Sequence, residues 1–369
     1  MNNLYDEMAG ILGESNGGTG GNGGNGGTGG NGGGSESGGL SPEDSTATTT
    51  PYLPTGFSKV AGTSLSTGLV IQDSTGNQYV WVEVPKTEDV YQKAGLTITS
   101  FTPDEYTAIE TDLHTYTSVY RKNTSFTDTY CADTNNASNW FTEATYNTAK
   151  KNMLKSVYQN GGFYVGRYET GIEASYRTSA VDITQTPTEI PVIKANAYPY
   201  NWVTRTQAQT LASNMASGDK TSSLMFGVQW DLVLAYLHNK GRIEDSTLTS
   251  DSATIGNYCD NEWNIKNTSA KYSTSLGESW DTCPYEKTTI LPVLLTTGAD
   301  ASFGKMNIYD IAGNVEEWTL EYTSDKDSPC ARRGGYYKYS GFVSPASCRS
   351  SSDVTYGSSD DVGFRVSLY

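Results

Sequence analysis

The sequence predicts a mixed α+β fold. Helical patterns gather in the middle of the chain, whereas short strands separated by turns lie at both ends of the region that follows residue 55. The regular strand–helix alternation of a parallel sheet is absent. With 369 residues, the chain has enough material for one large core or two small ones. Charged residues make up only 18%, while glycine (39) and tyrosine (26) are abundant, which is typical of a loop-rich, extracellular-type surface.

A β-hairpin is expected at the start of this region. Apolar residues 69–71 and 79–82 flank a turn at residues 73–77, and the second arm alternates apolar and polar positions. Residues 162–169 read as a further strand. Residues 245–300 are polar and irregular, a pattern that often marks a ligand-facing surface.

Three helices are expected in the middle of the chain. The first covers residues 142–158, whose apolar side chains fall on one side. The second begins at the capping box of residues 204–207 and runs to about residue 215. The third ends at Gly241 and has apolar residues at i, i+3, i+4 and i+7. These are Trp230, Val233, Leu234 and Leu237.

Three segments of different composition divide the chain. Residues 1–16 carry apolar side chains at helical spacing and are either a short anchor or oligomerisation helix or a frayed terminus. Residues 17–54 are rich in Gly, Ser and Thr; the triplet repeat at 17–34 predicts a flexible linker, or bundled chains if the protein is a trimer. Residues 55–369 are expected to form the globular domain.

Charge and hydropathy argue against a nucleic-acid partner, a membrane-spanning helix and a signal peptide. The net charge is −16 and no Lys- or Arg-rich run occurs, which argues against nucleic acid. No apolar run reaches the ~20 residues of a membrane-spanning helix, and the first residues lack the features of a signal peptide.

The five cysteines form no CxxC motif. Cys259–Cys283 or Cys330–Cys348 bridges and scattered thiols are both consistent with this spacing.

An ordered set of short motifs marks the C-terminal part. Residues 310–318 read Asp-Ile-Ala-Gly-Asn-Val-Glu-Glu-Trp, residues 333–335 read Arg-Gly-Gly, and residues 363–366 read Gly-Phe-Arg-Val. In this order they resemble the formylglycine-generating enzyme (sulfatase-modifying factor) family. The resemblance extends through most of residues 55–369. It implies a C-type-lectin-like fold, irregular, with short strands and a few helices.

The resemblance also implies a structural calcium ion. In the family, the segment that matches Asp310 to Glu317 wraps a calcium ion. The expected ligands are the carboxylates of Asp310 and Glu317 and the backbone carbonyls of Gly313 and Val315, since hard cations prefer oxygen. The alternative is a turn whose acids face water.

The catalytic residues of the family are missing. Its two copper-binding cysteines would fall near Tyr339 and Ser344, so no thiolate pair is present for Cu(I). A related branch uses three histidines to bind iron, whereas this chain has only His114 and His238. We therefore expect no copper, no iron and no catalytic residue of these kinds.

A ligand-binding face is expected within residues 333–369. This segment is rich in Tyr, Ser, Gly and Asp, which supply contact area and adaptable hydrogen bonds in antibody loops. It resembles the variable region of proteins diversified by retroelements; the alternative is a loop set without a ligand. The candidate contact residues are Tyr336, Tyr337, Tyr339, Ser340, Phe342, Ser352, Asp353, Tyr356, Ser358 and Asp360.

Together these features predict a non-enzymatic, adhesin-like receptor-binding protein. The resemblance places such proteins on phage or prophage tails or on bacterial surfaces, so we expect a virion, extracellular or cell-surface location. The expected partner is a cell-surface protein or glycan, with anchoring to a particle or homo-oligomer formation through residues 1–16. The alternative is an enzyme of the sulfatase-modifying factor family with altered chemistry.

Overall fold

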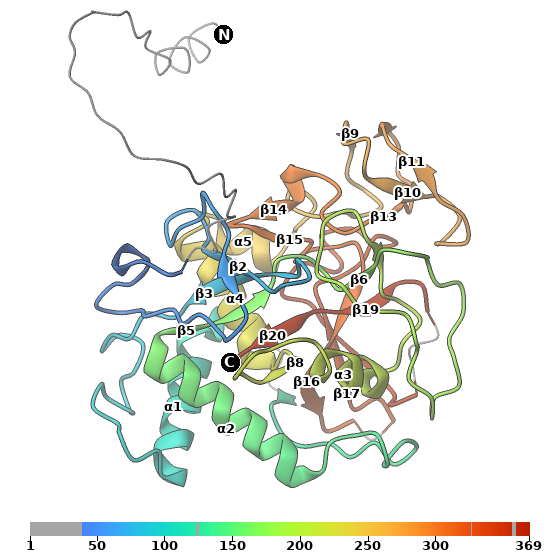
Figure 1. Cartoon of the computed structure of the whole chain (residues 1–369). Coiled ribbons are helices and arrows are strands. Elements are labelled where there is room, and N and C mark those ends of the chain that lie inside the picture. The colour runs from blue at the N-terminus through green and yellow to red at the C-terminus, as the bar shows by residue number, and fades with distance from the viewer. Residues whose placement is uncertain (1–38, 123–124, 326, 356–358) are drawn as a thin grey trace, which may run out of the picture. The chain divides into compact units, whose positions relative to one another are not determined.

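Two mostly antiparallel sheets organise the structure, a computed structural model that describes residues 39–122, 125–325, 327–355 and 359–369 (Figure 1). The larger sheet is antiparallel throughout and has the order β1-β2-β3-β5-β20-β8. Its C-terminal strand lies between two strands from the middle of the chain, so the sheet joins the ends of the domain. Its strands are β1 (Ser58–Lys59), β2 (Val70–Gln72), β3 (Gln78–Glu83), β5 (Gly162–Gly166), β8 (Ser222–Leu224) and β20 (Val366–Leu368).

The second sheet is built around one long strand, β16 (Glu316–Thr323). Its order is β18-β17-β16-β19, and β4 also pairs with β16. Only the β16–β19 pair is parallel. The other strands are β4 (Phe126–Thr127), β17 (Cys330–Arg333), β18 (Arg349–Ser352) and β19 (Val362–Phe364). The predicted α+β class is therefore confirmed.

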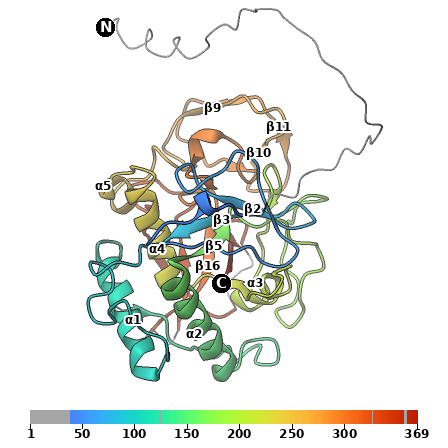
Figure 2. The same ribbon diagram turned by 60° about the vertical axis from the view of Figure 1, so that its left-hand side comes forward.

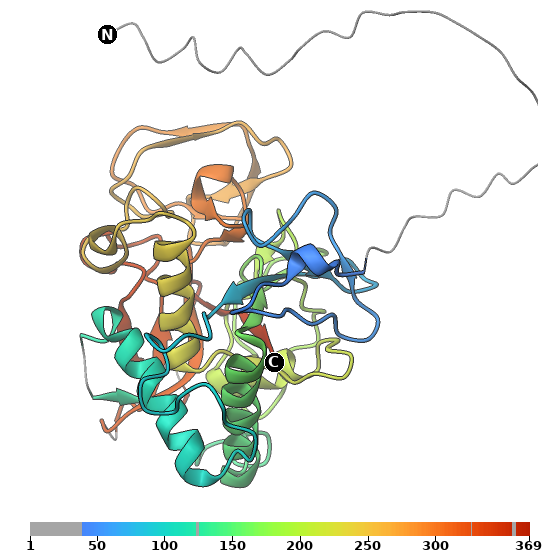
Figure 3. The same cartoon turned by 90° about the vertical axis from the view of Figure 1, so that its left-hand side faces the viewer.

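The three predicted helices are present, with small changes at their ends. They are α2 (Glu143–Asn160), α3 (Arg205–Ser213) and α4 (Gly227–Asn239). Helix α2 ends at Gly161, whose φ of 67° lies in the left-handed region that favours glycine. A further long helix, α1 (Pro103–Tyr116), packs beside α2 (Figure 3). The short helix α5 (Asp245–Thr249) follows α4.

The segment predicted to be irregular forms small sheets with their own apolar cluster (Figure 2). Buried Ile265, Val293, Leu295 and Phe303 belong to this cluster. The short strands here are β9 (Trp263–Ile265), β10 (Lys271–Ser273), β11 (Asp281–Thr282), β12 (Tyr285–Lys287) and β13 (Leu294–Leu295). Two further hairpin-like pairs are β6 (Gly171–Ile172) with β7 (Tyr198–Pro199) and β14 (Gly304–Lys305) with β15 (Ile308–Tyr309).

The globular domain begins before the predicted boundary at residue 55. Thr49 is buried, and its hydroxyl accepts a hydrogen bond from the Trp81 indole at 2.9 Å. Asp44, also buried, pairs with Lys59 at 2.7 Å. Residues 39–54 therefore belong to the domain. The predicted anchor at 1–16 and the rest of the predicted linker lie outside the described residues.

The structure also shows the state of the cysteines and the hydropathy of the described helices. All five cysteines are free thiols, so neither of the considered bridges forms. Among the described residues, no helix is long and apolar enough to cross a membrane.

A buried ionic network connects α4 to the second sheet. Asp231 of α4 accepts from Arg333 at 2.7 Å, from Arg349 at 2.6 Å and from Arg121 at 2.7 Å. Glu321 of β16 accepts from Arg333 at 3.1 Å and from Arg349 at 3.0 Å. Because Arg333 and Arg349 share both carboxylates, removal of either acid leaves a single carboxylate to balance the buried guanidinium groups.

We predict that Asp231→Asn destabilises the domain by about 3–5 kcal/mol, because it leaves three arginines around a neutral amide. Urea unfolding measures the change. The control is Glu173→Gln, which breaks the exposed pair with Lys194 (2.9 Å) and should cost about 1 kcal/mol or less. Equal losses in the two variants would contradict a structural role for the network.

Candidate ligand-binding face

The loop between β17 and β18, residues 334–348, carries the first half of the predicted face. It begins at Gly334 and Gly335, both with positive φ (96° and 72°). A side chain on Gly335 would meet the Ser344 carbonyl oxygen at 2.0 Å. The two ends of the loop therefore approach each other closely, and its tip projects from a tight base.

Large apolar side chains lie exposed at this tip. Tyr339 is 48% exposed, Phe342 72% and Val343 60%. The described residues include eight exposed large hydrophobic side chains, and these three fall within five positions of the sequence. The Tyr336 and Tyr339 rings lie 4.7 Å apart between centroids. The tip thus concentrates apolar surface that a folded monomer ordinarily buries or scatters.

Backbone hydrogen bonds hold the tip in place. The Cys259 amide donates to the Tyr339 carbonyl at 2.9 Å, and the Ser252 amide donates to the Gly341 carbonyl at 3.1 Å. The Gly341 amide donates to the Asp260 carboxylate at 3.2 Å. The segment 252–260 therefore positions the tip through main-chain contacts that do not depend on the exposed side chains.

Three of the predicted contact residues are buried: Tyr337, Ser352 and Asp360. The Tyr337 hydroxyl donates to Asp360, and Lys338 pairs with the same carboxylate at 2.8 Å. Burial and the contact with Asp360 raise the pKa of Tyr337 well above its usual value. These three side chains therefore lie below the exposed surface of the predicted face. Sequence spacing alone does not show which of the tyrosine rings is buried.

The other predicted contacts vary in accessibility. Tyr336 and Ser340 are half-buried, and Asp353 is exposed. The Asp353 carboxylate accepts from the Thr355 amide at 2.7 Å, which makes it part of a turn. Tyr356 and Ser358 lie outside the described residues.

Sequence reasoning missed two side chains near the tip. Val343 was not among the candidates because valine is rare in antibody-like loops. Ile290 is 79% exposed, and the amide of its neighbour Leu291 donates to the Cys259 carbonyl at 3.0 Å. Since Cys259 also bonds to Tyr339, the loop that carries Ile290 adjoins the tip. The sequence gives no signal that separates Ile290 from the apolar residues after it, of which Val293, Leu294 and Leu295 are buried.

The predicted calcium segment forms a sharp turn. Asp310, Gly313 and Asn314 all have positive φ (55°, 74° and 57°). Asp310 and Glu317 are both buried. The backbone therefore curls between the two acids, and both are buried and do not face water.

Arg365 lies against this turn. Its Nε lies 3.0 Å from each oxygen of Glu317, and its guanidinium also donates to the carbonyls of Gly166, Tyr309 and Asp310. Burial acts to lower the pKa of Arg365, but attraction to Glu317 outweighs it and raises this pKa. Glu317 is therefore already neutralised by an arginine.

Two further carboxylates surround the same position. Glu169 accepts from the Asn314 amide group at 2.7 Å and from the Val315 backbone at 3.2 Å. Burial, and then repulsion from Asp310 and Glu317, raises the pKa of Glu169 well above its usual value. Three buried acids thus face one arginine. Oδ2 of the buried Asp310 also accepts a hydrogen bond from the Gly298 amide at 2.6 Å.

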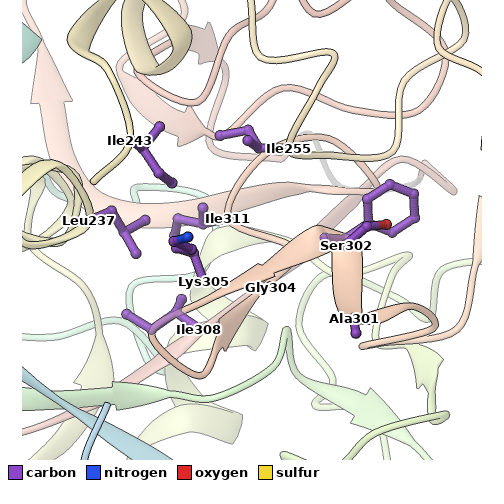
Figure 4. A pocket seen from close by; sticks show the side chains of 10 residues that line it. Leu237, Ile243, Ile255, Ala301, Ser302, Gly304, Lys305, Ile308 and Ile311 are labelled. Atoms are coloured by element: carbon purple, nitrogen blue, oxygen red, sulfur yellow. The ribbon is translucent and has the colours of Figure 1, made fainter. Parts of the chain in front are cut away.

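An apolar pocket of about 220 Å³ lies between α4 and the β14–β15 pair (Figure 4). Ser302 and Lys305 are the polar residues in a lining that is otherwise apolar or glycine. The lining residues are Leu237, Ile243, Ile255, Ala301, Ser302, Phe303, Gly304, Lys305, Ile308 and Ile311.

Comparisons with known proteins add little. No family model matches the chain, and no curated protein matches it. Among solved structures, the chain is similar to Treponema denticola variable protein 1, with 15% identity and a TM-score of 0.24, over 81% of this chain and 86% of that one.

We predict that Tyr337→Ala destabilises the domain by about 3–5 kcal/mol, as expected for the loss of a buried ring. Tyr339→Ala should change the free energy of unfolding by about 0.5 kcal/mol or less, because this ring is half exposed. Urea unfolding of both variants distinguishes a side chain that stabilises the loop from one that lies on its surface. A large loss in Tyr339→Ala would show that the tip is part of the core.

Proposed function

We propose that this protein is a non-enzymatic ligand-binding protein whose C-type-lectin-like domain, of the formylglycine-generating enzyme type, presents the 334–348 loop to its ligand. The observation that carries the proposal is the exposed apolar tip on a rigidly held loop. The binding face consists of Tyr336, Tyr339, Ser340, Phe342 and Val343, together with Ile290 from the adjoining loop.

Preorganisation supports a role in binding. Aromatic side chains provide large contact areas at low entropic cost, and they dominate the energetics of many interfaces. Main-chain hydrogen bonds to residues 252–260 already fix the tip. The loop therefore loses little conformational entropy when it binds a ligand.

We propose that the ligand is a protein or glycan on a cell surface, and that the protein acts in an adhesin-like manner on a virion or a cell surface. The apolar centre of the face fits a protein surface or the apolar side of a sugar ring. Variation of the tip by a retroelement, as the sequence resemblance implies, would change the ligand and leave the support in place.

We predict that alanine at Tyr339, Phe342 and Val343 together lowers binding by at least roughly tenfold, with an unchanged melting temperature. Labelled protein is tested on a panel of intact bacterial strains and on a glycan array. The matched control is Val119→Ala with Ile190→Ala, which removes exposed apolar side chains (41% and 77% exposed) from other segments. Binding of the tip variant equal to the wild type, on targets that the wild type binds, would refute the proposal.

We also propose a structural calcium ion at the turn formed by residues 310–317. Asp310 would supply the carboxylate, and Gly313 and Val315 their backbone carbonyls. The support is the charge balance of the buried cluster, in which Arg365 alone opposes three acids. A bound calcium would relieve this repulsion and fix the turn that begins β16.

We predict that EGTA lowers the melting temperature of the wild type and that added calcium restores it, by the equivalent of about 2.7 kcal/mol at a hundredfold excess over the dissociation constant. Asp310→Asn should remove this response, since it keeps the shape and removes the charge. Glu317 is unsuitable for the test because its loss leaves Arg365 buried without a partner. The control is Asp300→Asn, in a neighbouring turn. A wild-type melting curve indifferent to both EGTA and calcium would disprove the proposal.

A further inference from the structure

Three metal-ligating side chains meet at the end of α1, away from the face and the turn described above. Glu110 and His114 lie four residues apart on α1 and therefore share one side of the helix. Asp128 follows β4. One ligand atom from each of the three lies within 4.8 Å of the other two, the only such group among the described residues.

Asp128 is a fixed member of this group. It is buried, and its carboxylate accepts from the backbone amides of Gly227 at 2.6 Å and Val228 at 2.9 Å. These amides are the first two of α4, whose N-terminus favours a negative charge. The carboxylate therefore keeps its position and its charge, and each oxygen retains a free lone pair.

His114 carries a nitrogen that the fold leaves unused. Its Nε2 atom is buried and has no hydrogen-bond partner, a costly state for a polar atom. It lies 3.9 Å from Oδ2 of Asp128, too far for a hydrogen bond. Two ligands of a tetrahedral zinc ion at its usual bond lengths lie about 3.3 Å apart, so a small shift would place both on one metal.

A lysine lies at the same place. Lys150 of α2 contacts Oε1 of Glu110 at 2.6 Å and donates to the backbone carbonyl of Asp128 at 2.7 Å. Its side chain is 18% exposed, so it has a route to solvent. The ammonium group supplies positive charge to the acids but offers His114 no acceptor.

We propose that Glu110, His114 and Asp128 form a binding site for a divalent transition metal ion such as zinc. One imidazole nitrogen and two carboxylate oxygens suit zinc and its first-row neighbours better than calcium, which prefers oxygen alone. The metal competes with Lys150 for Glu110, and the fourth position is left for water. The ion would connect α1 to the segment that follows β4.

The test uses untagged, chelator-treated protein, with zinc chloride in melting experiments and cobalt(II) chloride in visible absorption. Zinc should raise the melting temperature of the wild type, and cobalt should give the d–d bands of a bound low-symmetry ion, which added zinc removes. His114→Gln should abolish both effects. His238→Gln, the other histidine of the chain, is the matched control and should leave both unchanged.

Lys150→Met separates a metal site from an ordinary ion-pair cluster. Removal of the competing ammonium should tighten zinc binding on the order of tenfold, measured by titration calorimetry. Because this variant gains affinity, a folding defect does not imitate the result. Absence of a zinc response in the wild type, an equal response in His114→Gln, or weaker binding in Lys150→Met would each overturn the proposal.

Discussion

Strand β16 buries the carboxylates of Glu316, Glu317 and Glu321. The rest of the structure depends on the arginines that neutralise two of them, Glu317 and Glu321. A buried carboxylate without a partner is strongly unfavourable, so each of the two must be met by a guanidinium at close range. Arg365 meets the first, and Arg333 and Arg349 meet the second. All three arginines come from the C-terminal motif region. This pairing gives the Arg-Gly-Gly and Gly-Phe-Arg-Val motifs a physical role.

These arginines connect the two sheets to each other and hold the 334–348 loop. Arg365 lies between β19, which pairs with β16, and β20, which enters the six-stranded sheet, so its bond to Glu317 joins the two sheets (Figure 1). Arg333 and Arg349 lie at the two ends of the 334–348 loop. Both also contact Asp231 of α4. The loop that carries the proposed binding face is thus held at both ends by the same buried network.

Much of the fold could be predicted because its signals are local. A capping box fixes the start of α3, an apolar side identifies α2, and an apolar side followed by Gly241 identifies α4. Helix α1 had equally local signals, Thr102 with Glu105 as a capping box and Pro103 in the first turn, but its apolar side is weak. The pair Glu110 and His114 was also visible at i, i+4. Its third member, Asp128, joins it only through the fold.

The binding face could be predicted only in part, because its inward and outward residues are decided by distant contacts. Tyr337 and Tyr339 are two residues apart in one loop, yet one is buried against Leu294 and Val315 and the other faces solvent. The choice rests on the bonds from Cys259 and Ser252, about eighty residues earlier in the chain. The loop sequence has no periodicity from which those backbone hydrogen bonds could be predicted.

This arrangement separates the residues that stabilise the loop from those that a ligand would meet. Stability rests on the buried arginines, on Gly335 at the base, and on main-chain hydrogen bonds of Tyr339 and of Gly341, where a side chain would meet the Ala253 backbone at 2.2 Å. The exposed positions, Tyr339, Phe342 and Val343, make few contacts that the domain needs. Substitution at the tip is therefore expected to change the contact surface at little cost in stability, whereas substitution at Tyr337 or Arg333 affects the domain itself. The proposed binding function would require such a division, and the buried pairs that β16 makes with Arg333 and Arg349 at the ends of the loop contribute to it.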